Sequence, residues 1–255
     1  MSGQIKPKIK IVSLKEVPAR RDYFKKNNSH LDYEFFDAID GKNIPEEVLT
    51  DINIFADDLK NYTPGAKGCA LSHRALWKEC VETNQPMVIA EDDTVFRLDF
   101  YEQYNRLVEE TPEEWDIITL SWGLDSIVIT KDIDDGYTEF HMFQDHKNID
   151  LEKFKNKKSK PNLFLQDFTV GTVCYAISPS GARKFLDFCF PIDNFTLEWE
   201  FKHPETSCRG VYFSEGIDVS MLSLKHMMNW YVAMPQIVMT ENILAESTIR
   251  GENAL

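Results

Sequence analysis

Three consecutive carboxylates, Glu91, Asp92 and Asp93, follow the short apolar run 88–90 in the segment VIAEDDTVF. Acidic residues are depleted in β-strands, and like charges placed side by side repel each other. A hard divalent cation removes that repulsion, because such ions are held by carboxylate oxygens and are commonly shared with substrate phosphates. Side chains alternate along an extended strand, so Glu91 and Asp93 are expected to act together while Asp92 points to the other side. An exposed acidic turn is the simpler interpretation.

Strand and helix patterns alternate on both sides of this acidic cluster, through residue 122. Buried strands are expected at KIKIVSL (8–14), LDYEFFDAIDG (31–41), MVIAE (87–91) and DIITLSW (116–122). Helices are expected at 17–28, at 44–52, after Thr63-Pro64-Gly65 and at 100–108. Such alternation predicts an α/β domain with a mainly parallel central sheet. Ligands of open α/β sheets bind at the carboxyl ends of the strands, which is where the acidic cluster lies.

The pattern is weaker after residue 122. Residues 144–162 are polar and Lys-rich and are expected to form a loop, while 190–216 are aromatic and irregular. A strand is expected at TVCYAIS (172–178), and Ser178-Pro179 has the sequence of a helix N-cap followed by proline in the first turn. A helix at 219–228 and an apolar strand at 230–239 are expected last. No internal repeat or low-complexity linker is visible, which predicts one domain over 1–255 with an elaborated C-terminal half.

The composition limits the classes of partner. The formal net charge of −14 argues against nucleic acid, because proteins that bind phosphate backbones need a basic face. With 43% hydrophobic residues, the chain can bury a sizeable core. The cysteines are odd in number and lack CxxC spacing, which argues against a disulfide framework and a zinc finger; they stand at positions 69, 80, 174, 189 and 208. Reduced, mostly buried thiols are expected instead.

Neither a signal peptide nor a membrane span is expected. The N-terminal segment MSGQIKPKIKIV contains no long apolar stretch, and no run of about 18 apolar residues follows it. A cytoplasmic location is the resulting expectation. Peripheral association with a membrane through a partner stays open.

Five segments and their order carry a resemblance to a known family. They are IVSLKEVPARRDYF, YEFFDAIDG, TPGAKGCALSHRALWK, VIAEDDTVF, and GTVCYAIS followed two residues later by GARK. In this order they resemble glycosyltransferase family 25, which contains lipopolysaccharide galactosyltransferases and the collagen hydroxylysine galactosyltransferases. The resemblance runs from about residue 9 to residue 186, with a weaker tail at IDVSM, MPQIV and ESTI.

The resemblance implies a GT-A type, Rossmann-like fold, with a nucleotide-binding half at 1–125 and an acceptor-binding half at 126–255. It also implies a UDP-sugar donor, usually UDP-galactose, and a divalent metal, usually Mn²⁺ or else Mg²⁺. Glu91-Asp92-Asp93 takes the place of the DxD motif, with Asp93 on the metal and Glu91 on the ribose or a metal-bound water. Members are expected to invert the anomeric carbon, so a carboxylate should deprotonate the acceptor hydroxyl while the metal stabilises the leaving diphosphate.

Residues near the expected nucleotide site are candidates for donor binding. They are Ser13, Leu14 and Arg20 after the first strand, Asp37 and Ala38 at the end of the second, Lys67 at the glycine-flanked start of a helix, and Asp92 with Glu91. A guanidinium, or an ammonium at a helix start, suits phosphate. The alternatives are a solvated helix face for Arg20 and Arg21, a plain strand end for Asp37 and Ala38, and a surface lysine for Lys67.

His73 lies at helical spacing with Cys69, Leu76 and Cys80, on one apolar face. A histidine on such a face is most often a hydrogen-bonded core residue. The resemblance adds the alternative that His73 contacts phosphate or supports the site. Cys69 and His73 also have the spacing of a pair of zinc ligands, but no third and fourth ligand accompany them.

Two acids are candidates for the catalytic base. Asp218, in GIDVSM, matches the late acidic position of the family best, and Asp193, in PID, competes with it. His226 is expected about two turns beyond Asp218 on the same helix, where it would complete the metal site with Glu91 and Asp93. Sugar stacking is the candidate role, and core packing the default, for Trp122, Trp199 and Trp230.

The sequence therefore predicts a metal-dependent inverting glycosyltransferase that moves a hexose, galactose first, from a UDP-sugar to a glycan or hydroxylysine acceptor. One rival is a metal-dependent nucleotidyl or phosphoryl transferase that uses the same acids. Another is a non-catalytic nucleotide-sugar-binding module with the same fold, and the simplest is an α/β interaction protein with an acidic surface. The sequence fixes neither the donor sugar nor the acceptor.

Overall fold

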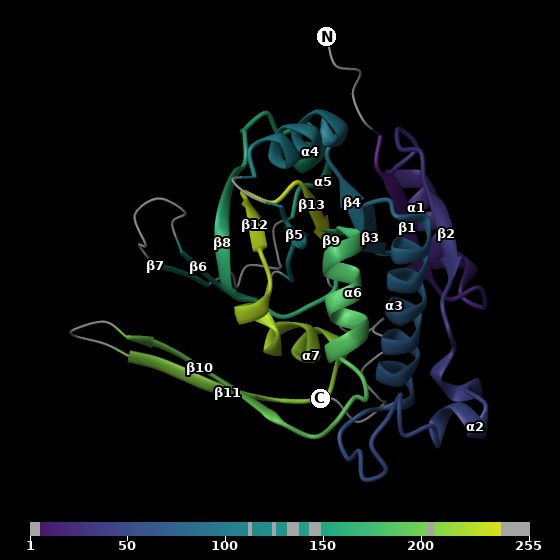
Figure 1. The fold of residues 1–255 in the computed structure, drawn as a ribbon. Helices are drawn as coiled ribbons and strands as arrows, with labels where there is room; N and C mark the ends of the chain where they lie inside the picture. The colour runs from purple at the N-terminus through teal and green to yellow at the C-terminus, as the bar shows by residue number, and fades with distance from the viewer. Residues whose placement is uncertain are drawn as a thin grey trace.

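A nine-stranded sheet forms the centre of the protein (Figure 1). The computed structural model describes residues 6–111, 114–123, 126–131, 138–142, 149–202 and 207–240. In spatial order the strands are β2 (Glu34–Asp37), β1 (Lys8–Ser13), β3 (Met87–Glu91), β9 (Cys174–Ile177), β5 (Ile117–Ser121), β12 (Trp230–Met234), β8 (Asn162–Phe168), β6 (Ile127–Lys131) and β7 (Thr138–Met142). Two small antiparallel sheets pair β10 (Thr196–Lys202) with β11 (Ser207–Phe213), and β4 (Thr94–Phe96) with β13 (Val238–Thr240).

Helices lie on both faces of the central sheet. They are α1 (Pro18–Asn27), α2 (Glu46–Leu49), α3 (Pro64–Thr83), α4 (Phe100–Glu109), α5 (Leu151–Lys155), α6 (Pro179–Phe188) and α7 (Ile217–Ser223), with the 3-10 turns η1 (Gly41–Asn43) and η2 (Lys225–Met227). Every strand and helix expected up to residue 122 is present. None of the described helices combines the length and the apolar character needed to cross a bilayer.

Alternate residues of the central strands pack into two separate hydrophobic cores. Met87 and Ile89 of β3 belong to the core under α3 and α6, whereas Val88 and Ala90 belong to the core under α1 and α4. A strand buried on both faces needs an uninterrupted apolar run, which is what precedes Glu91. The acidic cluster therefore begins at the point where the strand leaves the core.

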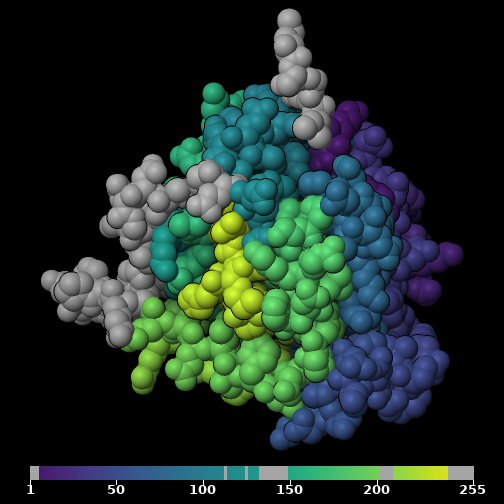
Figure 2. All heavy atoms as spheres, viewed as in Figure 1, coloured from purple at the N-terminus to yellow at the C-terminus, as the bar shows by residue number. Residues whose placement is uncertain are grey.

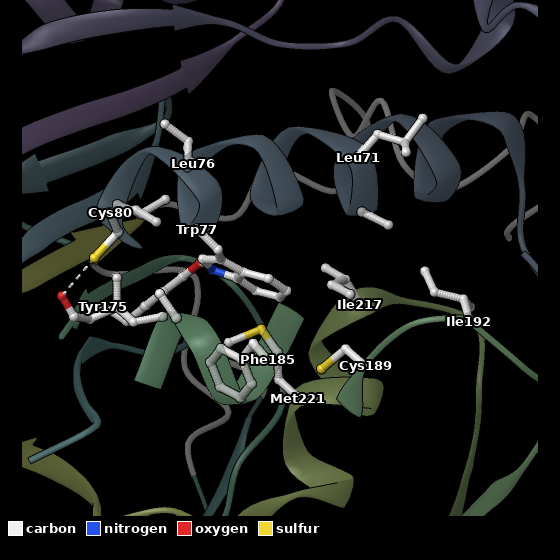
Figure 3. Packing of buried hydrophobic residues seen from close by; sticks show 14 of the residues in the cluster. Leu71, Leu76, Trp77, Cys80, Tyr175, Phe185, Cys189, Ile192, Ile217 and Met221 are labelled. Atoms are coloured by element: carbon white, nitrogen blue, oxygen red, sulfur yellow. Dashed lines mark hydrogen bonds between the residues drawn. The ribbon is translucent and has the colours of Figure 1, made fainter. Parts of the chain in front are cut away.

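Helices α3 and α6 cover one face of the sheet side by side (Figure 2). The indole of Trp77 on α3 faces the ring of Phe185 on α6, with ring centroids 4.8 Å apart (Figure 3). Both helices begin as their sequences indicate: the Thr63 hydroxyl accepts the N–H of Ala66, and the Ser178 hydroxyl accepts the N–H of Gly181. These caps satisfy backbone donors that the helices themselves leave free.

The expectation of a mainly parallel sheet is wrong. Three of the eight neighbouring strand pairs are parallel, namely β1 with β2, β1 with β3 and β5 with β12, and five are antiparallel. Strand β9 inserts between β3 and β5 and runs antiparallel to both, and the strands β8, β6 and β7 at one edge of the sheet supply the other three antiparallel pairs. Strands β2, β1, β3, β5 and β12 nevertheless run in the same direction, so their carboxyl ends share one edge of the sheet.

Three expectations for the second half need correction. Residues 190–216 are not irregular, since they contain the β10–β11 hairpin. The described part of the expected loop 144–162 contains α5 and the first residue of β8, and residues 144–148 lie outside the described residues. The helix expected at 219–228 starts earlier and ends at Ser223, and the apolar segment at 230–239 is split into β12 and β13.

Replacing two buried threonines by valine should change the stability of the protein in opposite directions. The Thr130 hydroxyl is buried and has no hydrogen-bond partner among the described residues. The Thr119 hydroxyl donates to Gln166 Oε1 at 2.6 Å and accepts from Trp230 Nε1 at 2.8 Å. We expect Thr130→Val to raise the free energy of unfolding by up to about 1 kcal/mol. We expect Thr119→Val to lower it by about 1–3 kcal/mol, because only this substitution leaves buried polar groups without their hydrogen-bond partner.

Urea unfolding of both variants and the wild type measures this difference. A loss of stability in Thr130→Val as large as that in Thr119→Val would show that the Thr130 hydroxyl has a partner.

Candidate active site

Asp92 is the most tightly held of the three acids. Its side chain lies in the turn after β3 and is 3% exposed. The Ser13 hydroxyl, at the end of β1, donates to Oδ2 at 2.6 Å, and Arg20 Nε, on α1, donates to Oδ1 at 2.6 Å. Arg20 Nη2 also lies 2.5 Å from Oδ1 and 3.3 Å from Asp93 Oδ2. Asp92 thus ties β1 and α1 to the turn.

Glu91 makes a contact that Asp92 does not make, whereas Asp93 shares Arg20 with Asp92. The joint action of Glu91 and Asp93 stays a prediction. Glu91 Oε1 accepts a hydrogen bond of 2.6 Å from the Thr172 hydroxyl. Burial, together with the negative charge of Asp93, raises the pKa of Glu91 to about 7. Burial also raises the pKa of Asp93, while the nearby Arg20 acts in the opposite direction. The two carboxylates therefore occupy a desolvated region where their charges repel.

This pair has the chemistry of a site for a hard divalent cation. Asp93 Oδ1 is buried and has no hydrogen-bond partner among the described residues, so one oxygen is left for a ligand. Carboxylate oxygens are suitable ligands, and Mg²⁺ and similar ions often complete their shells with water and substrate phosphate. Glu91 and Asp93 are the residues that would hold such an ion. The described residues contain no group of three or more His, Cys, Asp or Glu side chains placed as metal ligands.

His226 does not join such a group. The expectation that it continues the helix of Asp218 is wrong, because α7 ends at Ser223 and His226 lies exposed on the 3-10 turn η2. The change of backbone geometry after Ser223 shifts the direction of the following side chains away from an α-helical repeat.

The structure separates the two candidate bases. Asp218 lies in the first turn of α7, and the backbone N–H groups of Val219 and Gly171 lie near its carboxylate. Burial raises the pKa of Asp218, whereas these N–H groups act to lower it. Asp193 is exposed in the loop before β10, where its carboxylate accepts the N–H of the adjacent Asn194 at 2.6 Å. Asp218 alone reaches the segment that also contacts Glu91.

Cys69 lies between the two ends of this site. Its thiol is hydrogen-bonded to the Thr172 side chain, and its pKa is raised by burial and further by the charges of Glu91 and Asp218. Sequence reasoning did not single out Thr172 or Gly171 and considered Cys69 only as a partner of His73. The available signal was the segment GTVCYAIS, in which Gly171 directly precedes the strand predicted at 172–178 and Thr172 begins it.

His73 lies in the core rather than at the acidic cluster. It is fully buried, and its Nδ1 is 2.6 Å from the Tyr175 hydroxyl, which also accepts from Trp77 Nε1 at 2.9 Å. Burial lowers the pKa of His73 to about 4, so the imidazole is neutral near pH 7. This placement matches the simpler interpretation of a hydrogen-bonded core histidine.

Most other donor-binding candidates gather at the ends of β1 and β2. Arg21 Nη2 donates to Asp37 Oδ1 at 2.6 Å and to the Ser13 carbonyl at 3.0 Å. The Ala38 N–H donates to the same carbonyl at 2.9 Å. Leu14, the residue that follows β1, is half-buried. These residues form the edge of the sheet beside Asp92.

Lys67 is placed elsewhere, in the first turn of α3, where its ammonium lies 5.5 Å from the centre of the Phe55 ring.

The candidate sugar-stacking tryptophans pack internally. Trp122 and Trp230 are 3% and 5% exposed, and Trp199 on β10 is half-buried against Phe168. Core packing, the default for these three side chains, describes their placement.

Fold and site together define an α/β protein with a carboxylate cluster where parallel strands end, the position at which open sheets of this class bind ligands. The chain belongs to glycosyltransferase family 25: a family model described as "Glycosyltransferase family 25 (LPS biosynthesis protein)" matches residues 6–196. The match covers the acidic cluster, Gly171 and Thr172, and it ends before Asp218.

Curated relatives of the same family include proteins named as enzymes and proteins named as inactive. The chain is 26% identical to "Procollagen galactosyltransferase 1-B" of Xenopus laevis, over 76% of the chain and 31% of the relative. It is 25% identical to "Procollagen galactosyltransferase 2" of Mus musculus, over 81% and 32%. It is 24% identical to "Inactive glycosyltransferase 25 family member 3" of Mus musculus, over 80% and 33%. The chain spans about a third of the length of the curated relatives that it matches.

Two neighbouring acids should respond oppositely to the loss of charge. Asp92→Asn leaves Arg20 partly buried without its closest carboxylate, so we expect the free energy of unfolding to fall by about 3 kcal/mol. Asp93→Asn removes a repulsion with Glu91, so we expect little change or a small gain in stability. Urea unfolding in EDTA measures both values without a contribution from bound metal. Equal losses in the two variants would contradict the different roles assigned to Asp92 and Asp93.

Proposed function

We propose that the chain is a metal-dependent, inverting glycosyltransferase that moves a hexose, with galactose as first choice, from a UDP-sugar to a glycan or hydroxylysine acceptor. The observation that carries this proposal is the half-buried pair Glu91–Asp93 at the carboxyl end of β3, in a member of glycosyltransferase family 25. A desolvated pair of acids is unfavourable by itself, and a site for a cation and diphosphate gives it a chemical reason.

In this proposal Asp93 and Glu91 would hold Mn²⁺ or Mg²⁺, and Glu91, the last residue of β3, would contact the ribose or a metal-bound water. When bound, the ion stabilises negative charge on the leaving diphosphate. The uridine lies along the ends of β1 and β2, near Ser13, Asp37 and Ala38. The shared direction of β2, β1, β3, β5 and β12 supports a GT-A-like nucleotide site at this edge.

Asp218 is the proposed general base. The acceptor hydroxyl gives its proton to the Asp218 carboxylate as its oxygen forms a bond to the anomeric carbon and the bond from that carbon to the UDP oxygen breaks. Attack on the face opposite the leaving group inverts the carbon. Burial raises the pKa of Asp218, which makes the carboxylate a stronger base than an exposed aspartate.

The donor and acceptor classes rest on the relatives. Two of those described above are named procollagen galactosyltransferases, which supports galactose as the sugar and a procollagen-like acceptor. A second candidate function is a non-catalytic nucleotide-sugar-binding module, since other relatives at similar identity are named inactive. The two functions share donor binding and differ in turnover.

Binding to a panel of UDP-sugars tests the donor class. We expect thermal shift and calorimetry to detect one preferred UDP-sugar in the presence of Mn²⁺ and to detect no binding in EDTA. Asp93→Asn should lose this binding and lower the rate of UDP release by more than about a hundredfold, because a missing metal ligand affects both steps. Tight binding by the wild type with no UDP release, whichever acceptor is offered, would favour the binding module. Failure to bind any UDP compound would remove the proposal.

A matched pair of aspartate variants tests the base. Asp218→Asn should lower kcat by about 10²–10⁴-fold and leave the affinity for the UDP-sugar within about threefold, because the base acts on the acceptor proton. Asp193→Asn, on the exposed loop, should keep the wild-type kcat. Steady-state rates with calorimetric affinities separate the outcomes, and a large loss in Asp193→Asn alone would reverse the assignment.

A further inference from the structure

Two adjacent residues, Gly171 and Thr172, contact the two carboxylates to which different roles are assigned above. The Thr172 hydroxyl donates to Glu91 Oε1 at 2.6 Å. The backbone N–H of Gly171 lies near the Asp218 carboxylate and acts to lower its pKa. These residues lie in the short connection between β8 and β9. A single peptide unit thus connects the residue beside Glu91, which is assigned to the sugar donor, with the residue beside Asp218, the proposed base.

The connection is fixed on several sides. The Glu91 N–H donates to the Val173 carbonyl at 3.0 Å, which extends the β3–β9 pairing up to the acidic cluster. Thr172 is 6% exposed, and the Cys69 thiol on α3 is hydrogen-bonded to its side chain. Buried and held by two elements, the Thr172 hydroxyl has a defined position from which to donate.

Gly171 has a backbone conformation that favours glycine. Its φ is +113°, in a region that L-residues with a side chain rarely adopt. A Cβ built on Gly171 meets nothing nearer than Val173 Cγ2 at 3.9 Å, so space is not the reason for glycine at this position. Its backbone turn is what brings the N–H toward Asp218.

We propose that Gly171 and Thr172 form a positioning bridge, in which Thr172 selects the orientation of the Glu91 carboxylate and Gly171 that of Asp218. The inference rests on the proposed function, since it assigns Glu91 to the donor and Asp218 to the acceptor proton. Neither bridge residue touches a reacting atom. A glutamate side chain has three rotatable bonds, and a single well-placed donor restricts it to few rotamers. Transfer between two bound substrates requires such fixed geometry.

The hydroxyl of Thr172 is tested by a conservative pair of variants. Thr172→Val keeps the shape of the side chain and removes its donor, so we expect the affinity for the preferred UDP-sugar with Mn²⁺ to fall about tenfold or more, as for a lost hydrogen bond to a charged group. Thr172→Ser keeps the donor and should bind within about twofold of the wild type. Thr130→Val, a buried threonine on β6 away from the acids, is the matched control and should bind as the wild type does.

Calorimetry gives the affinities, and thermal melting shows that all three variants are folded. Wild-type affinity in Thr172→Val overturns the role of the hydroxyl. An equal loss in Thr172→Val and Thr172→Ser also overturns it, because packing would then explain the effect. A wild type that binds no UDP-sugar overturns the proposed function and the bridge with it, and this result differs from both of the others.

The role of Gly171 is tested by comparing the change in kcat with the change in affinity for the UDP-sugar. We expect Gly171→Ala to lower kcat about tenfold or more while the donor affinity stays within about threefold, because the Asp218 end of the bridge is displaced. An unchanged kcat, or a donor affinity that falls as far as kcat, removes Gly171 from the bridge.

Discussion

The hydrogen-bonded carboxylate of Asp92 is the contact on which the acidic cluster depends. Ser13 and Arg20 satisfy its two oxygens from different elements, so the end of β1, the start of α1 and the turn after β3 are joined at one buried point. A charge removed from water is tolerated only when it is paired in this way. Because the turn is anchored in this way, Glu91 and Asp93 stay near each other, although burial and the repulsion between their negative charges disfavour ionised carboxylates there. A direct contact between Asp92 and the donor stays a prediction; its observed contacts support its two neighbours.

Local patterns were enough to predict the elements of the first half and the place of the acids. Apolar runs of strand length, helical spacing and the Ser178 cap each depend on a few neighbouring residues, and all are present in the structure. The acids could be placed at a strand end because carboxylates do not belong inside a doubly covered strand. The bland interpretation of His73 also followed from its apolar neighbours, and the pairing with Tyr175 agrees with it.

Long-range pairing could not be predicted in the same way. Periodicity does not reveal that β9, from the second half, lies between β3 and β5, so the sheet was expected to be mainly parallel. The contacts of Thr172 with Glu91 and of Gly171 with Asp218 depend on that insertion, and so does the contact of Thr172 with Cys69. Residue patterns alone likewise offered no means to separate Asp218 from Asp193, and only the family resemblance favoured Asp218; the two differ in burial and in the elements that they contact.

The position of β9 also constrains how the chain can be made. When residues 87–121 leave the ribosome, the facing edges of β3 and β5 have no partner strand, because β9 follows much later in the sequence. At a synthesis rate of about 5–20 residues per second, these edges wait for several seconds with their apolar side chains and backbone donors exposed. During that interval the nascent first half carries unpaired strand edges, which are templates for aggregation. For the same reason a fragment ending near residue 125 would lack the strand that closes its own sheet.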